Sequence, residues 1–132
     1  MRQMIAAEKE TMTVESVAKI LGGQVLYKGE GPGRSVRQVV ASDLMSDVLL
    51  VDDDDMLLIT SLASDQVLRT AQIVGAMGVV VSNGKPLPST MIDVARSLGI
   101  PLVTAPLSKY QTCVRVYLAL EAEKAEGAGG SR

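Results

Sequence analysis

The second half of the chain alternates short apolar runs with segments whose apolar residues recur at helical spacing. The apolar runs predict strands at 56–60, 78–82 and 100–104. The segments between and after them predict helices at 65–77, from 89 to 98, and following Ser108. Strands that are apolar on both faces and alternate with helices are typical of a mostly parallel sheet covered on both sides. We therefore expect a three-layer α/β/α domain.

The first half of the chain adds a helix and further short elements. Thr13 is a good N-cap for a helix that Gly22 and Gly23 end, because glycine readily adopts a left-handed conformation. Strands are expected at 24–28 and 36–42, one of them antiparallel, with a short helix over 44–51.

A glycine-rich segment, Gly29-Glu30-Gly31-Pro32-Gly33, separates the first two expected strands. It lacks the Gly-Lys-Ser/Thr of a phosphate-binding loop, contains a proline, and precedes a strand where such a loop precedes a helix. We expect a hairpin-like turn here.

Composition sets the size and organisation of the protein. The chain has 132 residues, of which 47% are apolar, and this fits one folded domain. We expect a polar leader over 1–11, a folded domain over 12–120 and a flexible, glycine-rich tail over 121–132. Both Met1 and Met12 could be the natural start of the protein.

Charge and residue content exclude several function classes. Thirteen basic and fifteen acidic side chains give a net charge of −2, and three tyrosines are the only aromatic residues. This argues against a nucleic-acid-binding protein. Histidine is absent, which removes the usual general base near neutral pH. No apolar run is long enough to span a membrane, and we expect a cytoplasmic protein.

Two single features could carry chemistry, and each has a plainer interpretation. The run Asp52-Asp53-Asp54-Asp55 could bind a hard cation, but it lacks the spacing of a calcium-binding loop and also fits a solvated acidic loop. Cys113 falls on a helical stripe with Tyr110, Val114 and Tyr117 and is expected to be a buried thiol. We expect no metal site.

Polar residues follow the expected strands at the points where the strands end. In an open parallel sheet these ends meet at one edge, beside helix N-termini, where ligands bind. The same residue types also serve as ordinary helix caps and turn residues. The tentative ligand-binding residues are Asp43, Thr60, Ser61, Arg69, Ser82, Asn83 and Thr104. Arg69 is included as an anion-binding side chain on the helix that follows Thr60.

The sequence resembles the DRTGG domain family over about four fifths of its length. The resemblance begins with the segment TVESVAKILGG at 13–23 and is most specific in VASDLMSDVLL at 40–50. It continues in the spacing of LLIT at 57–60, LRTA at 68–71 and GIPLVT at 99–104. Ser61 departs from the pattern, since the family has glycine after the LLIT strand.

The resemblance implies a fold similar to the N-terminal domain of HPr kinase/phosphorylase and to Mur ligase N-terminal domains. It implies a non-catalytic regulatory or ligand-sensing domain, without a cofactor, that forms a homodimer. Family members occur beside nucleotide-sensing CBS domains, so an adenine nucleotide is the expected ligand. Stand-alone members are often encoded near iron-only hydrogenase genes of anaerobic bacteria, which implies a link to energy metabolism.

Two other functions remain open at this point. The chain could be a ligand-free dimerisation or adaptor module for a partner protein. It could also be an enzyme that uses Asp43 or the acidic loop as a base with Mg²⁺, although no nucleophile–base pair is evident.

Overall fold

Five strands form one sheet at the centre of the computed structural model, which describes residues 12–31 and 33–130. The strands are β1 (Gln24–Tyr27), β2 (Gln38–Ala41), β3 (Met56–Thr60), β4 (Gly78–Val81) and β5 (Leu102–Thr104). Their order is β1-β5-β4-β3-β2, and all neighbours are parallel except β1, which is antiparallel to β5. The predicted α/β architecture is confirmed. The predicted leader, 1–11, lies outside the described residues.

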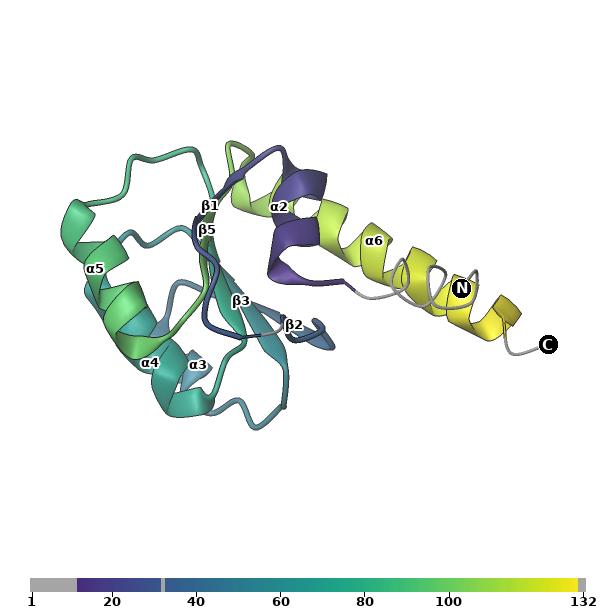
Figure 1. Ribbon diagram of the computed structural model, residues 1–132, viewed down its shortest axis with the longest axis horizontal. Helices are drawn as coiled ribbons and strands as arrows, with labels where there is room; N and C mark the ends of the chain where they lie inside the picture. The colour runs from purple at the N-terminus through teal and green to yellow at the C-terminus, as the bar shows by residue number, and fades with distance from the viewer. Residues whose placement is uncertain (1–11, 32, 131–132) are drawn as a thin grey trace.

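Helices cover both faces of this sheet, which makes the three layers visible in Figure 1. The helices are α2 (Val14–Leu21), α3 (Met45–Val48), α4 (Asp65–Val74), α5 (Ser89–Leu98) and α6 (Lys109–Gly130). α2 and α6 lie on one face, and α3, α4 and α5 lie on the other. Alternate residues of β3 enter the two cores, with Leu58 facing α4 and α5 and Ile59 facing α2 and α6. Both cores are aliphatic, as the continuous apolar runs predicted.

α2 has both end signals that the sequence predicted. The Thr13 hydroxyl accepts from the Ser16 amide at 3.3 Å, and the Ser16 hydroxyl accepts from the Thr13 amide at 2.7 Å. This reciprocal pair satisfies amides that the helix itself leaves without partners. Gly22, with φ of 64°, ends the helix in the left-handed conformation.

The expected hairpin across the glycine-rich segment is wrong. β1 and β2 do not pair, because they occupy opposite edges of the sheet. β1 runs antiparallel to β5 and so ends beside the start of β5, while β2 starts beside the start of β3. The described residues between β1 and β2, 28–31 and 33–37, therefore lie at the amino end of the parallel strands. A local turn signal could not reveal that distant strands would lie between β1 and β2.

The buried face of α6 also differs from the prediction. Thr112 and Val116 are fully buried, whereas Cys113 is only half-buried. The side chains expected beside Cys113 on a buried stripe instead face away from the sheet: Tyr110 (78% exposed), Val114 (36%) and Tyr117 (61%). The helix packs on α2 and β3 through its other side, because Val116 belongs to the core on that face.

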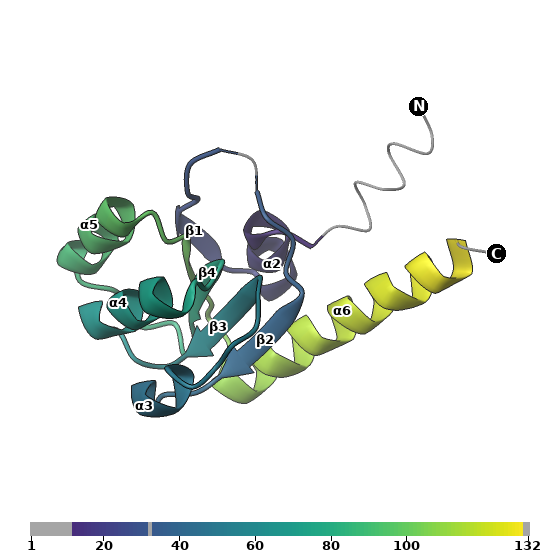
Figure 2. The same cartoon turned by 90° about the horizontal axis from the view of Figure 1, so that it is seen from below.

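α6 continues through most of the predicted tail. Its helical backbone reaches Gly130 and extends well beyond the sheet (Figure 2). The segment after Leu120 begins with alanine, glutamate and one lysine, which are strong helix formers, and Glu121 pairs with Lys124 at 3.6 Å one turn along. The domain boundaries and the flexibility of 121–132 stay predictions.

No described helix combines the length and the apolar character needed to cross a membrane.

A close backbone contact joins α2 to β5 and provides a test of the fold. A Cβ added to Gly23 would lie 2.1 Å from the Thr104 carbonyl oxygen, whereas one added to Gly22 would meet no atom within 4 Å. We expect Gly22→Ala to cost about 1 kcal/mol from its positive φ alone. Gly23→Ala should cost roughly 3 kcal/mol or more, because β1 or β5 must move. Urea unfolding of both variants measures this difference, and equal losses would contradict the contact.

Candidate functional site

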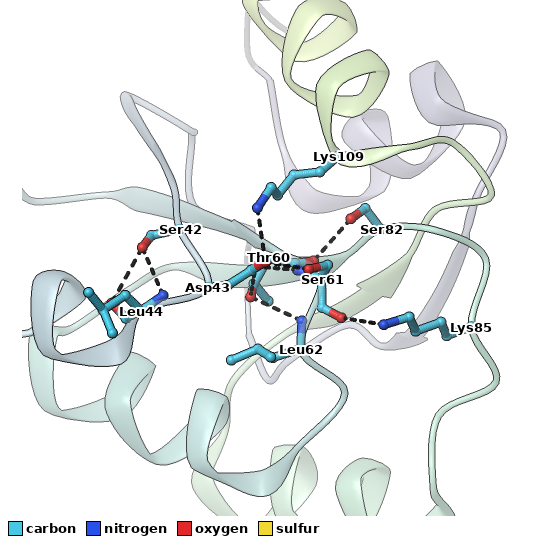
Figure 3. A network of polar contacts seen from close by, with 9 residues as sticks. All are labelled: Ser42, Asp43, Leu44, Thr60, Ser61, Leu62, Ser82, Lys85 and Lys109. Carbon is cyan, nitrogen blue, oxygen red and sulfur yellow. Dashed lines mark hydrogen bonds and ion pairs between the residues drawn. The ribbon is translucent and has the colours of Figure 1, made fainter.

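The Asp43 carboxylate accepts four hydrogen bonds at the carboxyl end of the sheet (Figure 3). Its Oδ1 accepts from the Thr60 hydroxyl at 2.9 Å and from the Ser61 amide at 2.7 Å. Its Oδ2 accepts from the Ser61 hydroxyl and from the Lys109 ammonium, the latter at 2.9 Å. Four bonds fill the lone pairs of a carboxylate, so the acceptor capacity of Asp43 is used within the protein.

The parallel pairing of β2 and β3 explains why these groups meet. Ala41 lies opposite Ile59 in the register, so the residues that follow the two strands emerge side by side. The Ser42 hydroxyl accepts from the Leu44 amide at 3.0 Å, which turns the chain at Asp43 before α3 begins. Thr60 is fully buried, so its hydroxyl has no access to solvent and depends on Asp43 as its acceptor.

Two opposing effects set the pKa of Asp43. Burial raises it, because the ionised form loses hydration. The hydrogen bonds from the Ser61 amide, the Ser61 hydroxyl, Lys109 and Thr60 lower it, and together they outweigh burial. The pKa of Asp43 therefore lies well below its ordinary value, and the carboxylate is ionised across the physiological pH range.

Two lysines from different loops meet at this end of the sheet. Lys109, the first residue of α6, pairs with Asp43, and Lys85, in the loop after β4, donates to the Ser61 carbonyl at 3.2 Å. Asp43, Thr60, Ser61, Lys85 and Lys109 are called the Asp43 cluster below. One carboxylate and two ammonium groups give this cluster a net charge of +1.

The structure brings four of the predicted site residues together. Asp43, Thr60 and Ser61 are in direct contact, and the buried Ser82 hydroxyl donates to the Thr60 carbonyl at 3.3 Å. The ligand-binding role of all the predicted residues stays a prediction.

The other three predicted residues lie apart from the cluster. Arg69 is exposed on α4 and makes no hydrogen bond or ion pair with any residue that the structure describes. Asn83 has an exposed side chain, and its backbone, with φ of 73°, forms the turn after β4 and donates to the Leu107 carbonyl at 2.7 Å. Thr104 lines a separate pocket beside β1.

The sequence interpretation missed both lysines of the cluster. Lys85 lies three residues after Ser82, and Lys109 lies five residues after Thr104, so each follows the end of a predicted strand. The signal that identifies them is a basic residue between the end of a strand and the first residue of the next helix. The predicted cation, Arg69, lies one full turn into α4.

The other candidate centres lie elsewhere. Asp52–Asp55 precede β3, at the end of the sheet opposite the Asp43 cluster, and Asp55 pairs with Arg34 at 2.8 Å. Across residues 12–31 and 33–130, no three acidic or cysteine side chains are grouped so that they could hold a metal ion.

Burial raises the pKa of the Cys113 thiol, although the charge of Lys109 acts to lower it.

Comparisons with known proteins give a fold relationship. No protein-family model matches the chain, and no curated protein matches it. A solved structure of the CBS and DRTGG domains of the regulatory region of Clostridium perfringens pyrophosphatase, complexed with the activator diadenosine tetraphosphate, superimposes with a TM-score of 0.65 at 16% identity. The match covers 88% of this chain and 50% of that chain, so this protein spans half the length of its neighbour. The likeness supports the α/β fold expected from the DRTGG resemblance.

The lowered pKa of Asp43 leads to a stability prediction. Its ionised form is favoured by folding, so its contribution is complete above about pH 5 and is lost as the pH falls through the lowered, folded-state pKa. We expect Asp43→Asn to reduce the free energy of unfolding by about 2 kcal/mol at pH 7, because it leaves the Thr60 hydroxyl and Lys109 poorly paired. The difference from wild type should shrink below pH 4. Urea unfolding at several pH values measures it.

Asp53→Asn is the matched control for this prediction. It removes the same charge from an exposed loop and should change stability by less than about 0.5 kcal/mol. Equal effects of the two variants, or a loss at Asp43 that does not depend on pH, would contradict the role of the carboxylate.

Proposed function

We propose that this domain is a non-catalytic regulatory domain of the DRTGG type that senses an adenine nucleotide at the Asp43 cluster. The observation that carries the proposal is the convergence of Lys85 and Lys109 at one end of a parallel sheet. Each ammonium group has three N–H donors and makes one hydrogen bond within the cluster, so donors remain for a phosphate. The nearby N-termini of α4 and α6 add positive potential at the same end.

Asp43 acts in this proposal as a positioning residue. Its four lone-pair positions are filled, so accepting from a ribose hydroxyl would require it to release a protein donor. By holding Lys109 and the backbone at Ser61, it fixes the side chains that would face the ligand. In this proposal Asp43, which the sequence predicts to be a ligand-binding residue, acts on the ligand through Lys109 and Ser61.

The electrostatics of the cluster favour sensing over catalysis. A carboxylate whose pKa is far below neutrality is a weak proton acceptor, so Asp43 is poorly suited to activate the Ser61 hydroxyl as a nucleophile. The acidic loop that could have held Mg²⁺ lies at the other end of the sheet. Together these features argue against the metal-dependent enzyme considered from the sequence.

The regulatory assignment also draws on the structural neighbour. The neighbour comes from a regulatory region and is complexed with a nucleotide activator. The fold that the two share covers 88% of the present chain and 50% of the neighbour. A cytoplasmic location and a link to hydrogenases rest on composition and family resemblance and stay predictions.

Nucleotide titration tests the proposal. We expect at least one of ATP, ADP and AMP to bind with a dissociation constant below about 1 mM and to raise the melting temperature, because a ligand that binds only the native state stabilises it. Lys85→Ala should weaken binding about tenfold, as expected for the loss of one charge-assisted hydrogen bond. Isothermal titration calorimetry and thermal unfolding provide the two measurements.

Lys28→Ala is the matched control, since Lys28 is exposed and follows β1 at the opposite end of the sheet. It should bind nucleotide as wild type does. Neither heat nor a melting shift with any of the three nucleotides at 5 mM would refute the proposed function.

Self-association is a second candidate function, favoured by the exposed side of α6. Four apolar side chains at helical spacing, here called the outer face of α6, point away from the sheet: Tyr110, Val114, Tyr117 and Leu118. Their exposed fractions range from 36% to 78%. A contiguous apolar stripe with this exposure, rich in tyrosine, is typical of a protein interface. We propose a twofold dimer in which the outer faces pack against each other.

Disruption of the stripe tests the dimer. Tyr117→Asp places a charge in the centre of the outer face and should convert the dimer to a monomer at tens of micromolar. The control Leu50→Asp alters a leucine that is 82% exposed in the loop after α3 and should leave the dimer intact. Multi-angle light scattering measures the mass; a monomeric wild-type protein would contradict the proposal.

A further inference from the structure

A pocket of about 460 Å³ lies beside the Asp43 cluster, on the α5 side of the sheet. It is bounded by the start of β1, the end of β5 and the loop that connects β4 to α5, which arches over this end of the sheet in Figure 1. Its volume falls within the ~300–1,000 Å³ typical of small-molecule sites. Lys85 belongs both to this pocket and to the Asp43 cluster, so the two sites are adjacent.

The lining of the pocket combines an aliphatic wall with two polar side chains that make no hydrogen bond to the described residues. Leu26, Leu87 and Ile92 provide the wall, and all three are partly buried against the core under α5. Gln24 and Thr104 are directly paired between β1 and β5, so their side chains share one face of the sheet. Neither the Gln24 amide group nor the Thr104 hydroxyl bonds to any residue that the structure describes.

We infer that this pocket holds the nucleobase of the ligand while Lys85 binds its phosphate, an inference that rests on the proposed function. A flat heterocycle needs apolar walls for its faces and hydrogen-bonding groups for its edge. A glutamine amide both donates and accepts, and so matches the adjacent amino group and ring nitrogen of adenine. Thr104 supplies a second donor and acceptor at the same edge.

The backbone around the pocket also permits close approach of a ligand. Gly22, Gly23 and Gly84 are among its lining residues. Gly23 lies against the Thr104 carbonyl, and Gly84, with φ of 61°, turns the chain just before Lys85. These glycines let the start of β1 and the loop after β4 border the pocket without side chains that would fill it.

Comparison of AMP with ribose 5-phosphate tests the inference in the full chain. Both probes carry the phosphate, and only AMP carries the base. We expect AMP to bind at least tenfold more tightly by calorimetry. Gln24→Ala and Thr104→Val should each reduce AMP affinity three- to tenfold and leave ribose 5-phosphate affinity unchanged. Gln72→Ala, an exposed glutamine on α4 at the other end of the sheet, is the matched control and should behave as wild type.

Methyl NMR provides a readout that does not depend on affinity. AMP should shift the methyl resonances of Leu26, Leu87 and Ile92 and leave those of Val114, on the outer face of α6, unchanged. Equal affinities for AMP and ribose 5-phosphate, with no methyl shifts in the pocket, would overturn the base site while leaving phosphate binding at Lys85 intact. Absence of binding by both probes would overturn this inference and the proposed function together.

Discussion

The arrangement of the carboxyl end of the sheet depends on the ionised carboxylate of Asp43. It joins three segments that are distant in the chain: the turn after β2, the end of β3 and the start of α6. The carboxylate accepts from the Thr60 hydroxyl, from the amide and hydroxyl of Ser61, and from the Lys109 ammonium. Of these residues, Thr60 is fully buried. Burying a hydroxyl without an acceptor is costly, so the bond to Thr60 favours keeping Asp43, and the loop that carries it, at the end of β3. The directions of Lys109 and of the Ser61 carbonyl, and through that carbonyl the position of Lys85, follow from it.

Lys109 and Lys85 have partners of different charge, and this difference determines which ammonium group could bind an anion. Lys109 faces a carboxylate, which neutralises most of its charge locally, while Lys85 faces only the neutral Ser61 carbonyl. Lys85 is also an exposed residue, so its bond to that carbonyl contributes little to stability and can be exchanged for a stronger one to a phosphate. Of the two lysines of the Asp43 cluster, Lys85 is therefore the one whose charge no carboxylate offsets, and it lies at the border between the cluster and the neighbouring pocket. This asymmetry is why the proposed phosphate contact is assigned to Lys85.

The sequence was sufficient for the sheet and for part of the site, for physical reasons that particular residues illustrate. The continuous apolar run of β3 is short, bounded by polar residues and buried throughout, as in the middle of a covered sheet, and its bounds were predicted as observed. Parallel pairing then brought Asp43 to Thr60 and Ser61, as expected from strand ends alone.

The hairpin prediction was wrong because turn residues specify a local bend and do not specify which strands pair. Lys109 was missed because its contact with Asp43 depends on how α6 packs, and 66 residues separate the two. The same packing reversed the expected inner and outer sides of α6.

The position of α6 connects the two functions proposed for the domain. Its first residue, Lys109, binds Asp43, and the next residue, Tyr110, begins the outer face that is proposed to form the dimer. Lys85 donates to the Ser61 carbonyl, and Ser61 donates to the carboxylate that holds Lys109. A ligand that draws Lys85 away from Ser61 would therefore act, through Asp43, on the first turn of the helix that carries the outer face. Since binding equilibria at two sites are linked reciprocally, dimerisation through α6 would then alter ligand affinity by the same factor. Under the two proposals, α6 carries a residue of the Asp43 cluster and the outer face on the same helix, so it is the element through which the two binding equilibria would be coupled.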